Sequence, residues 1–280
     1  MQFKGKFLDL SQPRVMGILN VTPDSFSDGG SFNQLDNALK QTELMLNEGA
    51  DFIDIGGEST RPGAQDVTLQ QELDRVIPVI EIITQRFDTI VSIDTSKAEV
   101  MTEAVSAGAR LINDVRALQE KGALKAAVEA KVPVCLMHMQ GEPRHMQQSP
   151  TYKNVVHDVS CFLQKRIDKC QEAGIGLDQI IVDPGFGFGK SLEHNYQLLA
   201  NLEQLYPLNV PVLTGMSRKS MLGNLLERKV GQRLAGSIAV ATIAAEKGVQ
   251  ILRVHDVKET VDAVKVVTII NAYRKNKNER

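Results

Sequence analysis

Eight short apolar runs, each ending on a polar residue, constrain the fold of this chain more than any other feature. They are rich in β-branched residues and cover residues 15–20, 52–58, 90–94, 111–114, 134–138, 180–183, 212–214 and 251–255. Runs of this kind are typical of strands buried on both faces, as in a parallel sheet. A charged or amide group at the end of such a strand is costly unless it has a partner. The eight polar ends therefore predict one shared site.

Helical patterns lie between the runs. Apolar residues recur at helical spacing over residues 33–48 and 69–87. Further helices are predicted over residues 122–130, 155–173, 192–205, 231–247 and 257–273. The stretch from Ser96 to Glu99 has the pattern of a capping box, which predicts that another helix begins there.

A strand followed by a helix, repeated eight times, predicts a single-domain α/β fold, the (β/α)8 TIM barrel. The alternative is an open doubly wound sheet, whose edge strands would usually be more polar than these runs. The chain of 280 residues shows no low-complexity linker, so residues 1–280 are interpreted as one domain. Residues 1–14 would form a short hairpin or plug at the base of the barrel, and residues 274–280 a frayed tail.

The composition of the chain argues against nucleic acid and membranes as partners. The net charge of −2 gives no basic surface for nucleic acid. No apolar run approaches the roughly 18 residues of a membrane span. The three cysteines, an odd count in a long chain, are interpreted as reduced thiols of a cytoplasmic protein.

Three strand ends carry side chains with hydrogen-bond acceptor oxygens. Asp94, Asn113 and Asp183 end the third, fourth and sixth runs. Two carboxylates and an amide in an apolar cup suit a flat heterocycle with several N–H donors. Each of the three could instead cap a helix.

Other strand ends suit a metal and an anion. Asn20 offers a neutral oxygen that could bind Mg²⁺, or it could be a turn residue. Arg253 and His255 alternate along a strand and would face the same side, which suits a phosphate or diphosphate. Arg61 and Lys219 extend this cationic set, although surface salt bridges are the more usual role of such residues.

The tripeptide Gly189-Lys190-Ser191 looks like the end of a phosphate-binding P-loop but lacks its first glycine, since Pro184 stands there. The loop before it would present Phe186 or Phe188 to a ring-binding pocket or to the core. The histidines and cysteines show no zinc-ligand spacing. His138 has no role that the sequence assigns.

Several segments together resemble the dihydropteroate synthase family of pterin-binding proteins. They are residues 16–30, 54–63, 183–190, 215–220 and 253–256, and the resemblance extends over essentially the whole chain. It implies a folate-pathway transferase, usually a homodimer. Such an enzyme joins 6-hydroxymethyl-7,8-dihydropterin diphosphate to p-aminobenzoate, giving 7,8-dihydropteroate and diphosphate, and is a target of sulfonamides.

The resemblance also implies roles for individual residues. Asp94, Asn113, Asp183 and Lys219 would hold the pterin, and Asn20 would bind Mg²⁺. The diphosphate would be held by Thr60, Arg61, Arg253 and His255, and p-aminobenzoate would be framed by Phe26, Pro62, Phe188 and Ser220. Charge developing on the pterin would be stabilised by Asp94, in an SN1-like substitution.

Two other functions are compatible with a pterin-binding barrel. One is transfer of a methyl group from a folate to a corrinoid, which would not need Arg253, His255 and the hydroxyls of residues 217–220. The other is a noncatalytic pterin-binding paralogue, which would be expected to lack some of Asn20, Asp94, Lys219 or Arg253. All four are present.

Overall fold

A computed structural model describes residues 1–22, 31–59, 66–141, 146 and 150–278. Eight parallel strands form its central sheet, in the order β8-β7-β6-β5-β4-β3-β10-β9. A bridge between Val182 and Val212 joins β8 to the segment before β9, so the sheet closes into a barrel. The strands are β3 (Arg14–Asn20), β4 (Phe52–Gly56), β5 (Ile90–Asp94), β6 (Leu111–Asp114), β7 (Val134–Met137), β8 (Ile180–Asp183), β9 (Leu213–Thr214) and β10 (Ile251–Val254).

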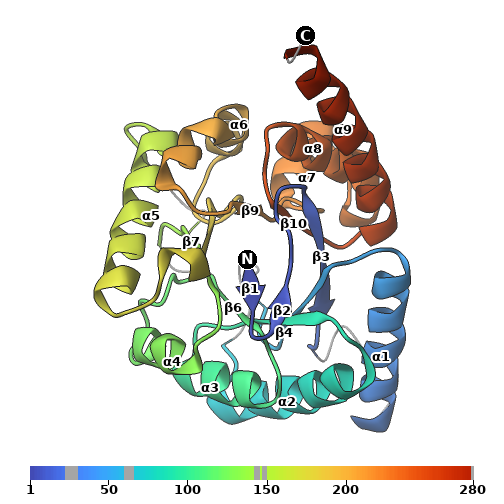
Figure 1. Cartoon of the computed structure of the whole chain (residues 1–280), viewed down its shortest axis with the longest axis vertical. Helices are drawn as coiled ribbons and strands as arrows, with labels where there is room; N and C mark the ends of the chain where they lie inside the picture. Colours follow the sequence, from blue (N-terminus) through green and yellow to red (C-terminus); the bar gives the residue numbers. More distant parts are fainter. Residues whose placement is uncertain (23–30, 60–65, 142–145, 147–149, 279–280) are drawn as a thin grey trace.

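Helices surround the barrel, as Figure 1 shows. They are α1 (Ser31–Asn47), α2 (Leu69–Arg86), α3 (Ala98–Ser106), α4 (Ala123–Ala130), α5 (Val155–Glu172), α6 (Leu192–Ala200), α7 (Ser220–Leu226), α8 (Leu234–Glu246) and α9 (Val257–Asn278), with short 3₁₀ helices at Leu177–Gln179, Leu202–Leu208 and Val230–Gln232. The predicted barrel is confirmed. None of the helices in the described ranges is both long and apolar enough to cross a membrane.

Several boundaries differ from the predictions. The predicted helix over residues 192–205 is α6 followed by a 3₁₀ helix that contains Pro207, because proline does not fit an α-helix interior. The predicted capping box at Ser96 is wrong. Its hydroxyl lies 2.5 Å from Asp114 Oδ1, and α3 begins one residue after Lys97 without a side-chain cap. At the other end of the chain, α9 continues to Asn278, further than predicted.

One buried apolar residue from each barrel strand forms the floor of the barrel interior. This layer consists of Met16, Phe52, Ile90, Leu111, Cys135, Ile181, Leu213 and Ile251, and Phe3 joins it from below. Because side chains alternate along a strand, the residues two positions further on face the same interior. That next layer includes Asp54, Asn113, Asp183 and Arg253. The polar site therefore lies directly above an apolar floor.

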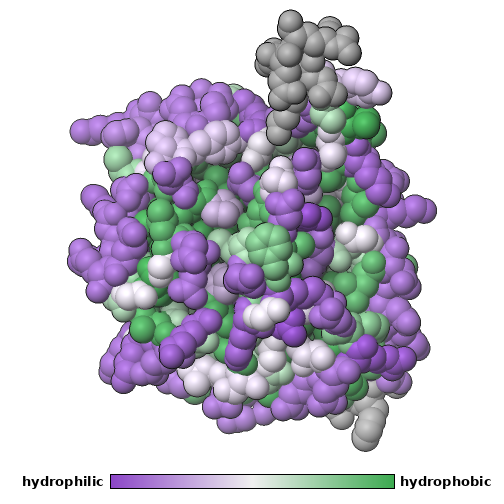
Figure 2. All heavy atoms as spheres, viewed as in Figure 1, coloured by the Kyte–Doolittle hydropathy of each residue, from purple (hydrophilic) through white to green (hydrophobic). Residues whose placement is uncertain are grey.

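The N-terminal hairpin covers the opposite end of the barrel. It is formed by β1 (Gln2–Phe3) and β2 (Lys6–Phe7), which lie at the centre of the ring of helices in Figure 1. The rings of Phe3 and Phe52 meet edge to face with centroids 5.2 Å apart. In Figure 2 the rim of this face is mainly hydrophilic, and hydrophobic side chains lie nearer its middle. The hairpin predicted within residues 1–14 is present, and Phe3 packs against the floor of the barrel.

We expect Phe3→Ala to lower the free energy of unfolding by about 3–5 kcal/mol, because it leaves a cavity under the barrel floor. The matched control is Phe7→Ala in the same hairpin, which should change it by less than about 0.5 kcal/mol. Phe3 is 0% exposed and Phe7 is 65% exposed. Urea unfolding measures both, and equal losses would show that the hairpin is not a plug.

Candidate functional site

Arg253 is the centre of the polar layer. Its Nε donates to Asp54 Oδ2 at 2.6 Å, and its Nη2 donates to Asp94 Oδ2 at 2.7 Å. The guanidinium on β10 therefore joins β4 to β5. Burial opposes its charge, but Asp54 and Asp94 raise the pKa of Arg253 further above its usual value, so it stays protonated.

Asp54 also holds the predicted pterin residue Asn113, whose Nδ2 donates to Asp54 Oδ2 at 3.2 Å. This central position of Asp54 was not identified from the sequence. A charge in the middle of the otherwise apolar run Phe52-Ile-Asp-Ile-Gly was the available signal, because such a carboxylate needs a partner.

Burial strongly affects the two other predicted carboxylates. It raises the pKa of Asp94 to about 7, against the opposing effect of Arg253. It also raises the pKa of Asp183, which is partly offset by Lys219 and by the hydrogen bond from Gly185 N to Asp183 Oδ1 at 2.7 Å. Hydrogen bonds from the N–H donors of a ligand would favour the charged form of both carboxylates and so oppose these shifts.

Lys219 faces Asp183 and the loop after β8. Burial lowers its pKa to about 8, although Asp183 opposes this shift. The ammonium donates to Phe186 O at 2.5 Å and lies 4.5 Å from the centre of the Phe188 ring. Of the two phenylalanines, Phe186 is buried in the core, and Phe188 is the one beside Lys219.

Two other predicted residues lie near this group. Ser220 is exposed and is the first residue of α7, directly after Lys219. His255 follows β10, and its backbone N–H donates to Ser217 Oγ at 3.2 Å while its Nδ1 lies 3.1 Å from the same hydroxyl. Thr60, Arg61, Pro62 and Phe26 lie outside the described residues.

Asn20 fits a weakly held divalent cation. A Cβ placed on Gly56 would lie 3.9 Å from Asn20 Oδ1 and 3.8 Å from Asp94 Oδ2, so both oxygens border the same space. Within the described ranges no group of three or more acidic, histidine or cysteine side chains could enclose a metal. One neutral oxygen, with ligand phosphates and water completing the shell, is compatible with Mg²⁺.

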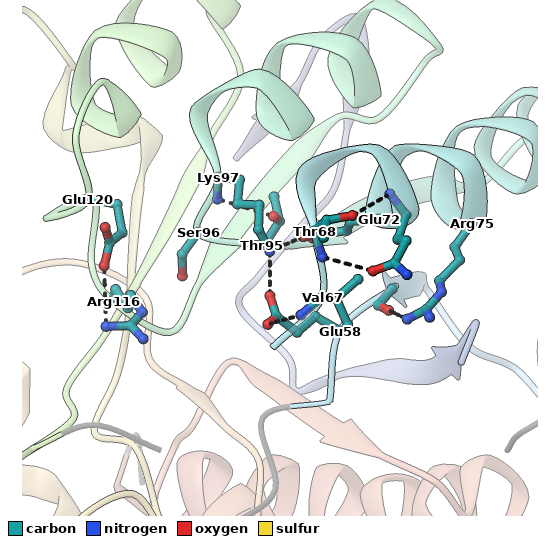
Figure 3. A network of polar contacts seen from close by, with 12 residues as sticks. Glu58, Val67, Thr68, Glu72, Arg75, Thr95, Ser96, Lys97, Arg116 and Glu120 are labelled. Atoms are coloured by element: carbon teal, nitrogen blue, oxygen red, sulfur yellow. Dashed lines mark hydrogen bonds and ion pairs between the residues drawn. The ribbon is translucent and has the colours of Figure 1, made fainter. Parts of the chain in front are cut away.

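A partly buried ion cluster, in which only Glu72 is fully buried, lies at the exit of β4, as Figure 3 shows. Lys97 Nζ lies 2.5 Å from a carboxylate oxygen of Glu58 and 2.5 Å from one of Glu72. The other oxygen of Glu58 accepts from Val67 N at 3.2 Å. Glu58 therefore joins the chain before residue 60 to the chain after residue 65.

The comparisons with known proteins agree with this geometry. A profile of the pterin binding enzymes matches residues 16–255. The dihydropteroate synthase of Escherichia coli K12 is 56% identical over 274 residues, which is 98% of this chain and 97% of that protein. The chain belongs to the pterin-binding enzyme family, as a dihydropteroate synthase. It is therefore a transferase.

Two solved structures of the family are similar throughout. Dihydropteroate synthase from Yersinia pestis, in a complex with a sulfonamide drug, has a TM-score of 0.93 at 58% identity and covers 97% of this chain and 99% of its own. The Xanthomonas albilineans enzyme, in complex with 7,8-dihydropteroate, has a TM-score of 0.88 at 48% identity. It covers 96% of this chain and 98% of its own.

We expect a bell-shaped dependence of kcat/KM for the pterin substrate on pH. The pKa of Asp94 is raised from 3.8 to about 7, so the carboxylate forms only as the pH rises through 7. The pKa of Lys219 is lowered from 10.5 to about 8, so its charge is lost above that value. The variant Asp94→Asn should lose the acid limb and keep the alkaline one. A rate that is flat from pH 6 to 7.5 in the unsubstituted enzyme would contradict a role for the Asp94 carboxylate.

Proposed function

We propose that this chain condenses 6-hydroxymethyl-7,8-dihydropterin diphosphate with p-aminobenzoate, giving 7,8-dihydropteroate and diphosphate in folate biosynthesis. The observation that carries the proposal is the position of Arg253. It holds two carboxylates, Asp54 and Asp94, and adds a cation to the same site. One part of this site accepts hydrogen bonds from a heterocycle, and the other binds an anion. A diphosphate ester of a pterin has both groups.

The pterin is assigned to Asp94, Asn113, Asp183 and Lys219. Among the described residues, the Asp183 carboxylate accepts a hydrogen bond from Gly185 N at Oδ1, which leaves acceptor capacity for the N–H edge of a ring. The apolar floor below gives the flat ring a surface on which to rest. Lys219 adds a donor beside the acceptors, as the mixed edge of a pterin requires.

The diphosphate is assigned to Arg253 and His255, together with Thr60 and Arg61. Two of the N–H groups of Arg253 hold carboxylates, and a guanidinium has five. The remaining donors suit phosphate oxygens. Asn20 would hold Mg²⁺, which when bound supplies positive charge that neutralises the departing diphosphate.

The p-aminobenzoate ring is assigned to Phe188, with Phe26 and Pro62, and its carboxylate to Ser220. The exposed Ser220 lies next to Lys219, which itself contacts the Phe188 ring. A sulfonamide of similar shape would compete for this position.

The reaction proposed for this site is an SN1-like substitution. The C–O bond to diphosphate breaks first, and its electron pair leaves with the diphosphate, which Arg253 and His255 stabilise. The pterin carries the resulting positive charge beside the Asp94 carboxylate. The arylamine nitrogen then forms the C–N bond with its lone pair and loses a proton to water. Because an arylamine is a weak base, this order needs no strong general base.

The reaction mixture of protein, Mg²⁺, pterin diphosphate and p-aminobenzoate tests the assignment. Release of diphosphate with formation of 7,8-dihydropteroate is expected, and absence of both would support a noncatalytic pterin-binding protein or a methyltransferase instead. Rapid quench without p-aminobenzoate tests the order of steps. Without p-aminobenzoate, diphosphate should be released in a detectable amount, up to one equivalent per site. Its complete absence would contradict a mechanism in which diphosphate leaves before the C–N bond forms.

Homodimer assembly and a cytoplasmic location stay predictions. Dimerisation is supported by exposed apolar side chains on two neighbouring helices, α8 and α9. They are Ile243, Val266, Ile269, Ile270 and Tyr273. Sedimentation velocity distinguishes a dimer from the 30.8 kDa chain.

A further inference from the structure

Lys190 is a buried lysine to which the proposed reaction gives no role. Its side chain is only 2% exposed and lies beneath the loop that joins β8 to α6. The ammonium donates to Gly185 O at 2.7 Å and to Phe188 O at 3.1 Å, and it lies 3.0 Å from His138 Nδ1. An ammonium has three N–H donors, so these three acceptors can use all of them.

His138 completes this arrangement as an acceptor. Burial, together with Lys190, lowers the pKa of His138 to about 2, so its imidazole is neutral at every ordinary pH. With Nδ1 accepting from Lys190, the ring proton belongs on Nε2. The ring is also fixed by an edge-to-face contact with Phe162, at a centroid distance of 4.9 Å.

The backbone of the same loop is held at several further points. Asn195 Oδ1 accepts from Gly187 N at 2.7 Å, and the Tyr152 hydroxyl donates to Gly189 O at 2.7 Å. A Cβ on Gly185 would lie 1.9 Å from His138 O, and Gly185 has a φ of +69°. The loop therefore lies directly against the segment that follows β7, where only glycine fits.

The upper side of this loop faces the site. Phe186 O accepts from Lys219, and the Phe188 ring lies 4.5 Å from the Lys219 ammonium. Residues 185–188 thus lie between two lysines, Lys190 below and Lys219 above. Asp183 is held by the sheet as well as by this loop. β8 pairs it with Met137, its carbonyl accepts from His138 N at 2.9 Å, and its Oδ1 accepts from Gly185 N at 2.7 Å.

We propose that Lys190, oriented by His138, is a positioning residue that holds Phe188 against Lys219 and so shapes the p-aminobenzoate side of the site. This inference rests on the proposed function, which assigns Phe188 to p-aminobenzoate. It gives specificity for the second substrate to a pair of residues that touch neither substrate. On the pterin side, Asp94 and Asn113 are held instead by Arg253 and Asp54.

The test is steady-state kinetics of the full-length enzyme with both substrates and a sulfonamide. In Lys190→Met, KM for p-aminobenzoate and the inhibition constant of the sulfonamide should rise at least about tenfold, since two loop carbonyls lose their buried side-chain donor. KM for the pterin diphosphate should change less than about threefold. Equal changes for both substrates, or no change for either, would overturn the proposal.

A matched pair at His138 separates positioning from packing. His138→Asn keeps an acceptor near the place of Nδ1, whereas His138→Leu removes it at similar volume. We expect His138→Leu to reproduce the selective loss and His138→Asn to restore most of the affinity for p-aminobenzoate. Equal behaviour of the two variants would contradict orientation by His138. If Lys190→Met does not fold, the comparison of His138→Asn with His138→Leu tests the proposal in its place.

Ile83→Ala is the control for general destabilisation, because Ile83 is buried near the end of α2, on the side of the barrel away from this loop. It should lower the melting temperature while leaving both KM values unchanged. Failure of the proposed function is a separate outcome, since the unsubstituted enzyme would then form no dihydropteroate at all.

Discussion

The site depends on one buried guanidinium. Arg253 reaches across the barrel from β10 to Asp54 on β4 and Asp94 on β5, and 199 positions of sequence separate it from Asp54. A buried ion pair whose partner is removed usually costs about 3–5 kcal/mol, because the remaining charge is left uncompensated. Each of the three side chains therefore constrains the other two. Asn113 joins this group of side chains through the hydrogen bond that its Nδ2 donates to Asp54.

The apolar floor explains why these charges act so strongly on one another. Water is excluded from below by the residues around Phe3 and Phe52, so the polar layer exchanges with solvent only from above. Under these conditions burial raises the pKa of Asp94 and lowers that of Lys219. A ligand with N–H donors and a diphosphate would add partners for Asp94 and Lys219 to those that they already have. In this low dielectric, the fixed charges of Arg253 and Asp94 interact more strongly with charge that develops in the proposed reaction than they would in water.

Much of this arrangement could be predicted from the sequence. Apolar runs with polar ends give the strands, and alternation along each strand places Asp183 and Arg253 above Ile181 and Ile251. The pairing of Arg253 with Asp54 could not be predicted, because no spacing rule connects residues so far apart. Ser96 was misassigned as a cap because Asp114, from another strand, competes for its hydroxyl. Lys190 looked like part of a phosphate loop, and only the fold shows its ammonium beneath the backbone.

The central claim is that Asp54 and Arg253 act as one unit. A double-mutant cycle of Asp54→Ala and Arg253→Met, measured as free energy of unfolding in urea, tests it most directly. Arg253→Met leaves the buried Asp54 carboxylate without its guanidinium, and Asp54→Ala leaves Arg253 with Asp94 as its one remaining carboxylate of the two, whereas the double variant removes both members of the pair. We expect the double variant to lose at least about 2 kcal/mol less than the sum of the single losses. Additivity within about 0.5 kcal/mol would contradict the account.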